Sequence, residues 1–161
     1  MTIATLIVLP VLLAAPAGRC EHSLVGTWIS DARATMSFNR QHAKLEDRQL
    51  QFLDSLMGRL RVEFSATEIH LHMPDFEVEI EGELEPFAGF EEHDSYRVLF
   101  CNAHMVVIEA GVPMIDEREA RTYFFVDENS VWTYVGNNNP KLPDLHIREY
   151  FVRVRPDLLT P

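Results

Sequence analysis

The stretch EIHLHMPDFEVEIEGELE, residues 68–85, alternates apolar and polar side chains on both sides of a central Pro-Asp pair. Apolar residues stand at every second position, from Ile69 to Met73 before the pair and at Val78 and Ile80 after it. This period of two is typical of a β-strand that buries one face and exposes the other. The stretch therefore predicts two half-buried strands, one on each side of the pair.

The two strands are predicted to form a hairpin around Pro74-Asp75, with a four-residue loop built on a type I turn. In this register the apolar faces coincide, and the glutamates that follow Phe76 lie on the side that faces water. A shift of one residue would expose the apolar face, so the pairing is strongly constrained. The facing pairs are Ile69 with Ile80, Leu71 with Val78, His70 with Glu79 and His72 with Glu77.

The polar face of this hairpin is a candidate divalent metal site. His70 and His72 point the same way from one strand, about 6.5 to 7 Å apart, and Glu77 and Glu79 face them from the next strand. Imidazole nitrogens and carboxylate oxygens are common zinc ligands. The alternative is a solvated sheet face without any cofactor, on which each exposed His–Glu pair contributes up to about 1 kcal/mol.

The spacing His70-x-His72-x4-Glu77 resembles the first metal-binding motif of the cupins. The resemblance implies that these three residues bind a metal inside a jelly-roll barrel. It covers eight residues, and the flanking glycine and the second cupin motif are missing from this chain.

The rest of the chain predicts one mainly β domain, residues 18–161. A helix over about 44–57 follows the first strand, because Leu45, Leu53 and Leu56 recur at helical spacing and Gly58 can end the helix. Closely spaced strands with short links favour an antiparallel up-and-down meander. Such a meander closes into a barrel or a strongly curved sheet. The predicted strands are 24–30, 60–65, 68–73, 76–84, 95–101, 104–109, 119–126, 130–135 and 145–154.

The segment Gly26-Thr27-Trp28 in the first predicted strand resembles the Gly-x-Trp motif of the lipocalin-like (calycin) proteins. The resemblance implies an up-and-down barrel, closed at one end by an arginine of the last strand that packs over the tryptophan. Arg153 and Arg155 are the candidates. The cation–π contact would contribute about 0.5 to 2 kcal/mol. The alternative is that Trp28 is a core aromatic residue of any β-sandwich or barrel.

Residues 1–17 are uncharged and apolar from Ile3 to Ala15, which predicts a secretory signal peptide cleaved after Ala17. The mature chain would then be periplasmic or secreted and would contain no transmembrane span. A buried first strand or an uncleaved anchor are the alternatives. In an oxidising compartment Cys20 and Cys101 can form a disulfide. Otherwise Cys101 is a small buried hydrophobic residue.

The net charge of −11 argues against nucleic acid as a partner, because the field of the protein would oppose a polyanion. None of the common phosphate-binding, serine-hydrolase or zinc-protease motifs occurs in the chain. The leading hypothesis is therefore an exported, non-enzymatic lipocalin-like domain that binds a small apolar ligand. The alternatives are an acidic interaction or inhibitor module with a basic protein partner, and a metal-dependent barrel enzyme.

Overall fold

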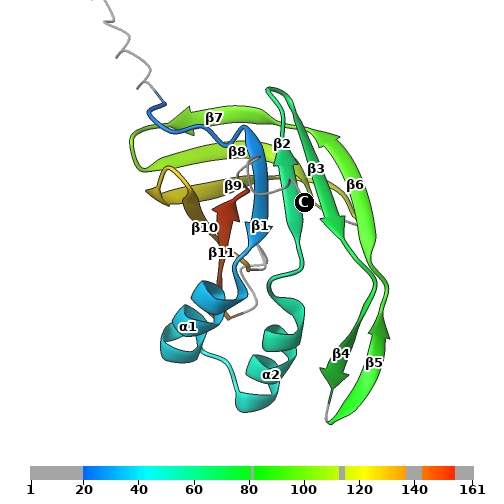
Figure 1. The fold of residues 1–161 in the computed structure, drawn as a ribbon. Coiled ribbons are helices and arrows are strands. Elements are labelled where there is room, and N and C mark those ends of the chain that lie inside the picture. The colour runs from blue at the N-terminus through cyan, green and yellow to red at the C-terminus, as the bar shows by residue number, and fades with distance from the viewer. Residues whose placement is uncertain (1–19, 81, 113–114, 137–142, 155–161) are drawn as a thin grey trace, which may run out of the picture.

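The computed structural model describes residues 20–80, 82–112, 115–136 and 143–154 (Figure 1). Within them the chain is a nearly closed antiparallel β-barrel with two helices at one end. The elements in chain order are β1 (Gly26–Ser30), α1 (Ala32–His42), α2 (Asp47–Leu56), β2 (Arg61–Phe64), β3 (Glu68–Met73), β4 (Phe76–Ile80), β5 (Glu83–Phe87), β6 (Phe90–Ser95), β7 (Arg97–Cys101), β8 (Met105–Val112), β9 (Ile115–Asp127), β10 (Ser130–Tyr134) and β11 (Arg148–Arg153).

The main sheet has the strand order β6-β3-β2-β1-β11-β10-β9-β8-β7, and β4 pairs with β5 in a separate two-stranded sheet. Neighbours in the main sheet are antiparallel, and most are consecutive in the chain. The predicted fold class, a mainly β antiparallel barrel, is confirmed. The predicted helix over 44–57 is present as α2. Helix α1 was not predicted.

The barrel interior is filled by alternate residues of most strands of the main sheet. Trp28 is 1% exposed and Ile108 is fully buried. Each large side chain buried in this way stabilises the fold by about 1.5 to 3 kcal/mol relative to exposure. The residues that form this core are Leu24, Trp28, Val62, Phe64, Ile69, Leu71, Tyr96, Val106, Ile108, Ala110, Tyr123, Val131 and Phe151.

Strands β1 and β11 join the first and last parts of the barrel, with Trp28 opposite Arg153. The guanidinium carbon of Arg153 lies 4.2 Å from the centre of the Trp28 ring, as the lipocalin-like motif implied. Arg153 also donates hydrogen bonds to the carbonyl oxygens of Ser23 and Val25. Gly26 has φ +129°, and a Cβ atom there would lie 2.7 Å from Nη1 of Arg153. This positive φ is strained for any residue with a Cβ atom, so glycine is strongly favoured beneath the arginine. Arg155, the other candidate, lies outside the described residues.

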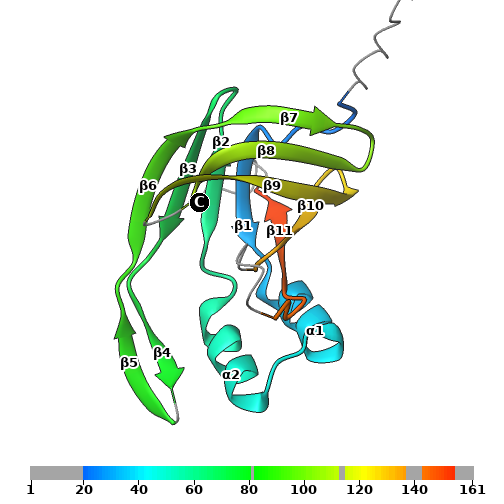
Figure 2. The same cartoon turned by 180° about the vertical axis from the view of Figure 1, so that it is seen from behind.

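A single bent segment, β6 followed by β7, connects the two edges of the main sheet (Figure 2). Strand β6 pairs with β3 on one side, and β7 pairs with β8 on the other. Tyr96, at the bend, is buried, and its hydroxyl donates to the carbonyl oxygen of Ser65. The two edges of the sheet are therefore joined by the continuous segment β6–β7, and this segment nearly closes the barrel.

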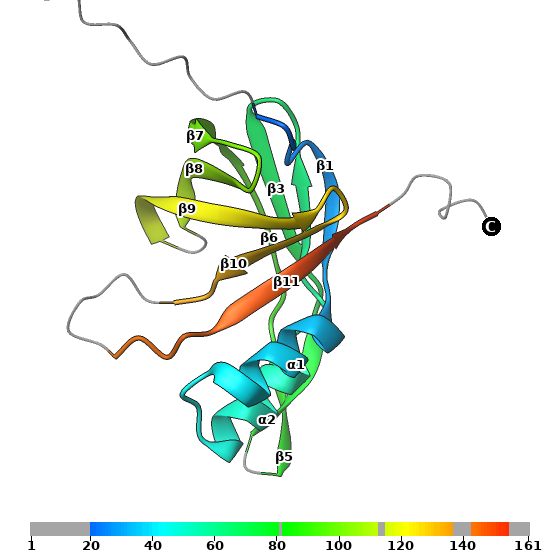
Figure 3. The same cartoon turned by 90° about the vertical axis from the view of Figure 1, so that its left-hand side faces the viewer.

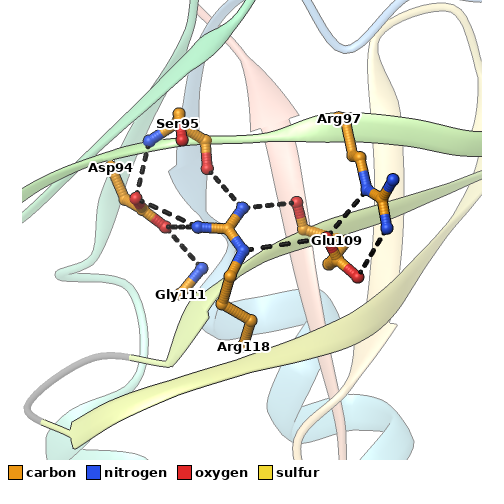
Figure 4. Close-up of polar contacts among 6 residues, drawn as sticks. All are labelled: Asp94, Ser95, Arg97, Glu109, Gly111 and Arg118. Carbon is orange, nitrogen blue, oxygen red and sulfur yellow. Dashed lines mark hydrogen bonds and ion pairs between the residues drawn. The ribbon is translucent and has the colours of Figure 1, made fainter.

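Arg118 of β9 spans the place where β6 separates from β8 (Figure 4). Its guanidinium contacts Asp94 at 3.0 Å and donates to the carbonyl oxygen of Ser95 at 2.9 Å. Asp94 also accepts a hydrogen bond from the backbone of Gly111 in β8. Burial acts to raise the pKa of Asp94, but the backbone hydrogen bonds and the charge of Arg118 outweigh it and lower the pKa. We call Asp94, Gly111 and Arg118 the latch.

The predicted hairpin between β3 and β4 is wrong. Strand β3 lies between β2 and β6, whereas β4 pairs with β5. The ladders β3–β6 and β4–β5 continue one another, so 68–95 forms one long hairpin that bends at Pro74-Asp75. The turn of this hairpin contains Gly82, which has φ +86°. Alternation on both sides of a Pro-Asp pair fits a bent strand as well as a tight turn, because both keep the period of two.

The bend is possible because Gly89 lies directly against the backbone of the other strand. A Cβ atom at Gly89 would clash with the carbonyl oxygen of Met73 and the carbonyl carbon of Pro74. The backbone N–H of Gly89 donates to Asp75 at 2.8 Å. This hydrogen bond holds the two strands together where Pro74 can donate none.

Beyond the bend, β4 and β5 form an arm beside α2 (Figure 1). Val78 is buried, but Ile80 is 44% exposed, which contradicts the predicted burial of that residue. The register places Glu77 and Glu79 on one face of the arm and Glu83 and Glu85 on the other. The glutamates therefore do not share one face. The four carboxylates are nevertheless all exposed.

Helix α1 takes the place of a strand along β11. Strand β1 ends at Ser30, and beyond it the side chains of Thr35 and Asn39 bond to the β11 backbone. Thr35 accepts from the N–H of Tyr150, and Asn39 both accepts from and donates to the backbone of Arg148. Residues i and i+4 of a helix are about 6 Å apart, which matches the two-residue repeat of a strand. Thr35 and Asn39 are fully buried.

Outside the barrel, Arg148 ties α1 to the sheet. Its guanidinium carbon lies 4.1 Å from the centre of the Phe38 ring and 3.8 Å from that of Trp132. Trp132 stacks on Phe124 of the next strand. Phe38, Phe124 and Trp132 form a partly exposed layer on the outside of the barrel. Tyr123, in contrast, lies inside the barrel.

A disulfide joins Cys20 to Cys101, with Cα atoms 5.2 Å apart. It ties the segment before β1 to the end of β7. The predicted pairing is therefore present. Among the described residues, no helix has both the length and the apolar character needed to cross a bilayer. The predicted signal peptide, residues 1–17, lies outside the described residues.

Gly89→Ala tests the bend. Because the added methyl group would push the two strands apart, we expect the free energy of unfolding to fall by about 1 to 3 kcal/mol. Urea denaturation followed by circular dichroism measures this change. Gly136→Ala is the matched control, since a Cβ atom there meets nothing within 4 Å. The control should change stability by less than about 0.5 kcal/mol. Equal effects of the two substitutions would contradict the role given to Gly89.

Arg118→Gln tests the latch. At pH 7 we expect a loss of about 1 kcal/mol, because the ion pairs are partly exposed. A carboxyl whose pKa is lowered by folding stabilises the protein above its ordinary pKa, here 3.8, and loses that contribution as the pH falls through the folded value. The difference between the two proteins in urea denaturation should therefore shrink from pH 7 to pH 3. A difference that stays constant over this range would rule out the electrostatic role.

Candidate functional site

Strands β9 and β10 diverge along their length (Figure 3). A cleft lies between their separated parts. Within the described parts of both strands, their ladder ends at the pair Tyr123 and Thr133. Beyond it β9 pairs with β8, and β10 with β11. The cleft has a volume of about 290 Å³. Its lining includes Glu119, Arg121, Thr122, Thr133, Gly136 and Asp144.

A buried carboxyl group, Glu149, lies in the barrel wall near this cleft. It belongs to β11 and is in phase with the core residue Phe151, so its side chain faces inward. Glu149 is 7% exposed. The buried hydroxyl of Ser30 bonds to its carboxyl group and itself accepts a hydrogen bond from the backbone N–H of Gly58. The end of β1 and the segment after α2 therefore hold this carboxyl group in place.

Burial raises the pKa of Glu149 to about 7, against the hydrogen bond from Ser30 and the charge of Arg121, which lower it. At neutral pH the group is thus close to half-protonated. The shift from 4.5 corresponds to about 3 kcal/mol of unfavourable free energy for the charged form. A carboxyl group with this pKa can both accept and donate a proton near pH 7.

Arg121 connects the buried carboxyl group to the cleft. Its side chain lines the cleft, is 25% exposed and forms an ion pair with Glu119 at 2.6 Å. It also bonds to the hydroxyl of Tyr123. Burial acts to lower the pKa of Arg121, but Tyr123 and Glu119 outweigh it and raise the pKa. Arg121 is therefore a fixed cation at the inner wall of the cleft. We call Glu119, Arg121, Tyr123 and Glu149 the inner polar cluster.

The histidines predicted to bind a metal lie elsewhere, on the outer face of β2, β3 and β6. His70 faces Glu63 of β2 on one side and His93 of β6 on the other. His72 lies in the next row, between Arg61 and Glu91. The predicted partners Glu77 and Glu79 are on the arm, where they pair with β5. The predicted grouping with the arm glutamates is therefore wrong, because β3 does not pair with β4.

A different group of metal-ligating side chains does come together there. Among the described residues, His70, Glu91 and His93 each offer one ligand atom within 4.8 Å of the others. The register of β3 and β6 produces this arrangement. Metal binding by these histidines stays a prediction.

Sequence reasoning missed the inner polar cluster. The spacing along the strands could have indicated it. Glu149 lies two residues before Phe151, and Arg121 lies two residues before Tyr123, so each is on the same inward face as a core residue. A charged residue at a core position marks a functional or strained site. His93 and Glu91 were missed because the stretch FEEHDS, which forms β6, was not predicted as a strand; after Phe90 it contains only polar residues and so lacks the apolar alternation of a strand.

Comparisons of the chain with protein-family models, with curated proteins and with solved structures found no match. The fold and the geometry of these sites are therefore the basis for a functional proposal.

Glu149→Gln tests the buried carboxyl group. A carboxyl whose pKa is raised by folding makes its full contribution to stability below about pH 4.5 and loses it as the pH rises towards about 7. Glutamine does not titrate. Relative to the wild type, the variant should therefore gain about 2 to 3 kcal/mol of unfolding free energy between pH 5 and pH 8. Urea denaturation at the two pH values measures this gain.

Glu79→Gln is the control for this experiment, because Glu79 is an exposed carboxylate on the arm. It should show no comparable gain. If the Glu149 and Glu79 variants have parallel pH profiles, Glu149 does not titrate near neutrality in the folded protein.

Proposed function

We propose that the protein is an exported lipocalin-like binding protein that holds a small polar molecule in the cleft between β9 and β10. One observation carries the proposal: the cleft opens onto Arg121, whose charge also acts on the buried Glu149. A barrel whose strands separate beside a charged, partly buried cluster offers a ligand both access and specific hydrogen bonds. Ligand sites in proteins combine a concave surface with a few such polar groups.

The lining of the cleft favours a polar ligand over the apolar one predicted from the sequence. The aromatic and aliphatic residues of the barrel interior pack against one another and form the core. The cleft, in contrast, presents hydroxyl, carboxylate and guanidinium groups. Its volume, about 290 Å³, lies just below the usual range for ligand pockets, roughly 300 to 1,000 Å³. The ligand is therefore small.

Charge narrows the ligand class further. Glu119 and Asp144 bring two carboxylates to the cleft, and Arg121 brings one cation. The chain as a whole carries a net charge of −11. Both facts disfavour an anion. The expected ligand is a neutral or positively charged molecule that bears hydroxyl or amino groups.

The disulfide between Cys20 and Cys101 supports export, since disulfides persist mainly in oxidising compartments outside the cytosol. The apolar residues 3–15 of the sequence are consistent with a secretory signal. We propose a periplasmic or secreted location on this basis.

Thermal denaturation with a panel of probes tests the ligand class. The panel contains monosaccharides, polyols and small amines on one side, and oleate and retinol on the other. We expect at least one polar compound to stabilise the protein, by about 2.7 kcal/mol when it is present at 100 times its dissociation constant. The apolar compounds should leave the stability unchanged.

Gly136→Phe locates the site. Gly136 lines the cleft, and a Cβ atom added there meets nothing within 4 Å. Phenylalanine at this position should therefore obstruct the cleft without unfolding the protein, and stabilisation by the polar compound should disappear. Ser37→Phe, at an exposed position of α1, is the control and should keep the stabilisation. Stabilisation by the apolar probes alone, or binding that survives Gly136→Phe, would refute the proposed site.

A further inference from the structure

Three neighbouring strands, β2, β3 and β6, form one wall of the barrel (Figure 1). Their register lines up the outward side chains in rows. The register puts Glu63, His70 and His93 side by side in one row. Glu91 stands two residues before His93 on the same outward face of β6. Directly opposed residues on one face of a sheet have Cβ atoms about 4.5 to 5.5 Å apart. Two imidazoles and a carboxylate are thus brought together by rigid elements.

The distances are those of a nearly assembled ligand set. The Oε1 atom of Glu91 lies 2.9 Å from Nε2 of His70 and 3.8 Å from Nε2 of His93. The two imidazole rings stack with their centres 3.8 Å apart and their planes at 14°. Both Nε2 atoms therefore approach the same carboxylate oxygen.

We propose that His70, Glu91 and His93 form a binding site for a divalent transition metal, with zinc as the best match. Two imidazole nitrogens and one carboxylate oxygen are a common protein contribution to a zinc site, with a fourth position for water. Ligand atoms of a tetrahedral zinc ion are about 3.3 Å apart, given bonds of about 2.0 to 2.1 Å. The three ligand atoms all lie within 4.8 Å of one another. Because the two imidazole planes are nearly parallel, at least one ring must rotate out of the stack before both nitrogens point at one ion.

Glu63 supplies a second layer of support. Its Oε2 atom lies 3.9 Å from Nδ1 of His70, on the side of the ring away from Glu91. Arg61 holds Glu63 through hydrogen bonds of 2.7 and 2.9 Å. A carboxylate beside the second nitrogen of a metal-binding histidine fixes the ring and strengthens the ligand. Glu63 is therefore a positioning residue for His70.

This site differs from the one that the sequence predicts, because it excludes His72 as well as the arm glutamates. His72 lies in the same row as Glu91, between that residue and Arg61, but the group of ligand atoms within 4.8 Å of one another does not include it. A metal ion held by His72 would lie close to that guanidinium group and would be repelled by it. The proposed histidine ligands, His70 and His93, lie opposite each other on two strands. The histidines predicted from the sequence, His70 and His72, lie on one strand.

Isothermal titration of the full, untagged chain with Zn²⁺ tests the site. We expect one equivalent to bind, and His93→Ala to weaken binding by about 100-fold through loss of one ligand. Glu63→Gln should weaken it by about 10-fold, as is typical when a supporting carboxylate is lost. His72→Ala is the matched control, because it removes an exposed histidine from the same strand, and it should change the affinity by less than about twofold. Co²⁺ should give the visible absorption of a tetrahedral site in the wild type and lose it in His93→Ala.

Circular dichroism and thermal denaturation of each metal-free variant show whether it is folded. His93 is 70% exposed, so its replacement should leave the fold intact. The proposal is overturned if the wild type binds no Zn²⁺, if His72→Ala weakens binding as much as His93→Ala does, or if a folded His93→Ala protein keeps the wild-type affinity.

Discussion

Each strand of a closed barrel needs a hydrogen-bonding partner along both of its edges, because an unpaired edge exposes a row of backbone donors and acceptors. This requirement explains the unusual parts of the structure. The segment β6–β7 changes partner in its middle, so that one piece of chain completes both ends of the sheet. Helix α1 completes the edge of β11 with the side chains of Thr35 and Asn39. The latch covers the remaining gap between β6 and β8.

The two sites depend on this constraint in opposite ways. The cleft exists because β9 and β10 stop pairing after Thr133, which leaves an entrance beside Arg121. The histidine group exists because β2, β3 and β6 stay in register over their whole common length, which places His70 directly opposite His93. The cleft beside Arg121 and the buried Glu149 thus arises where the sheet separates. The histidine group on the outer face arises where the sheet is unbroken.

The sequence predicts the parts of the fold that depend on local pattern. Alternation located most of the strands and identified Ile69, Leu71 and Val78 as buried residues. The Gly-x-Trp segment pointed to the contact between Trp28 and Arg153. The prediction failed where the pattern was ambiguous. Helix α1 buries the polar residues Thr35 and Asn39. Their burial is stabilised by hydrogen bonds to the backbone of a strand more than 100 positions away. Local sequence carries no sign of such a partner.

Pairing between strands was the harder problem. The alternation in residues 68–80 is equally compatible with a hairpin and with one bent strand, and the choice depends on Gly89, which lies far along the chain from Pro74. The predicted grouping of metal ligands was wrong for the same reason. The proposed ligands beside His70 come from β6, whereas the predicted carboxylates lie on β4. Glu149 and Arg121, in contrast, could have been found from their inward phase alone.

The two tryptophans lie in different environments, one in the barrel core and one on its outside near α1, so their fluorescence reports on each region separately. Trp28 is sealed in the barrel core beneath Arg153, whereas Trp132 lies outside, stacked on Phe124 and covered by Arg148. Detachment of α1 would withdraw Phe38 from Arg148 and alter the emission of Trp132, while Trp28 would keep the emission of a dry environment. Fluorescence can therefore separate loosening of the outer helix from opening of the barrel itself.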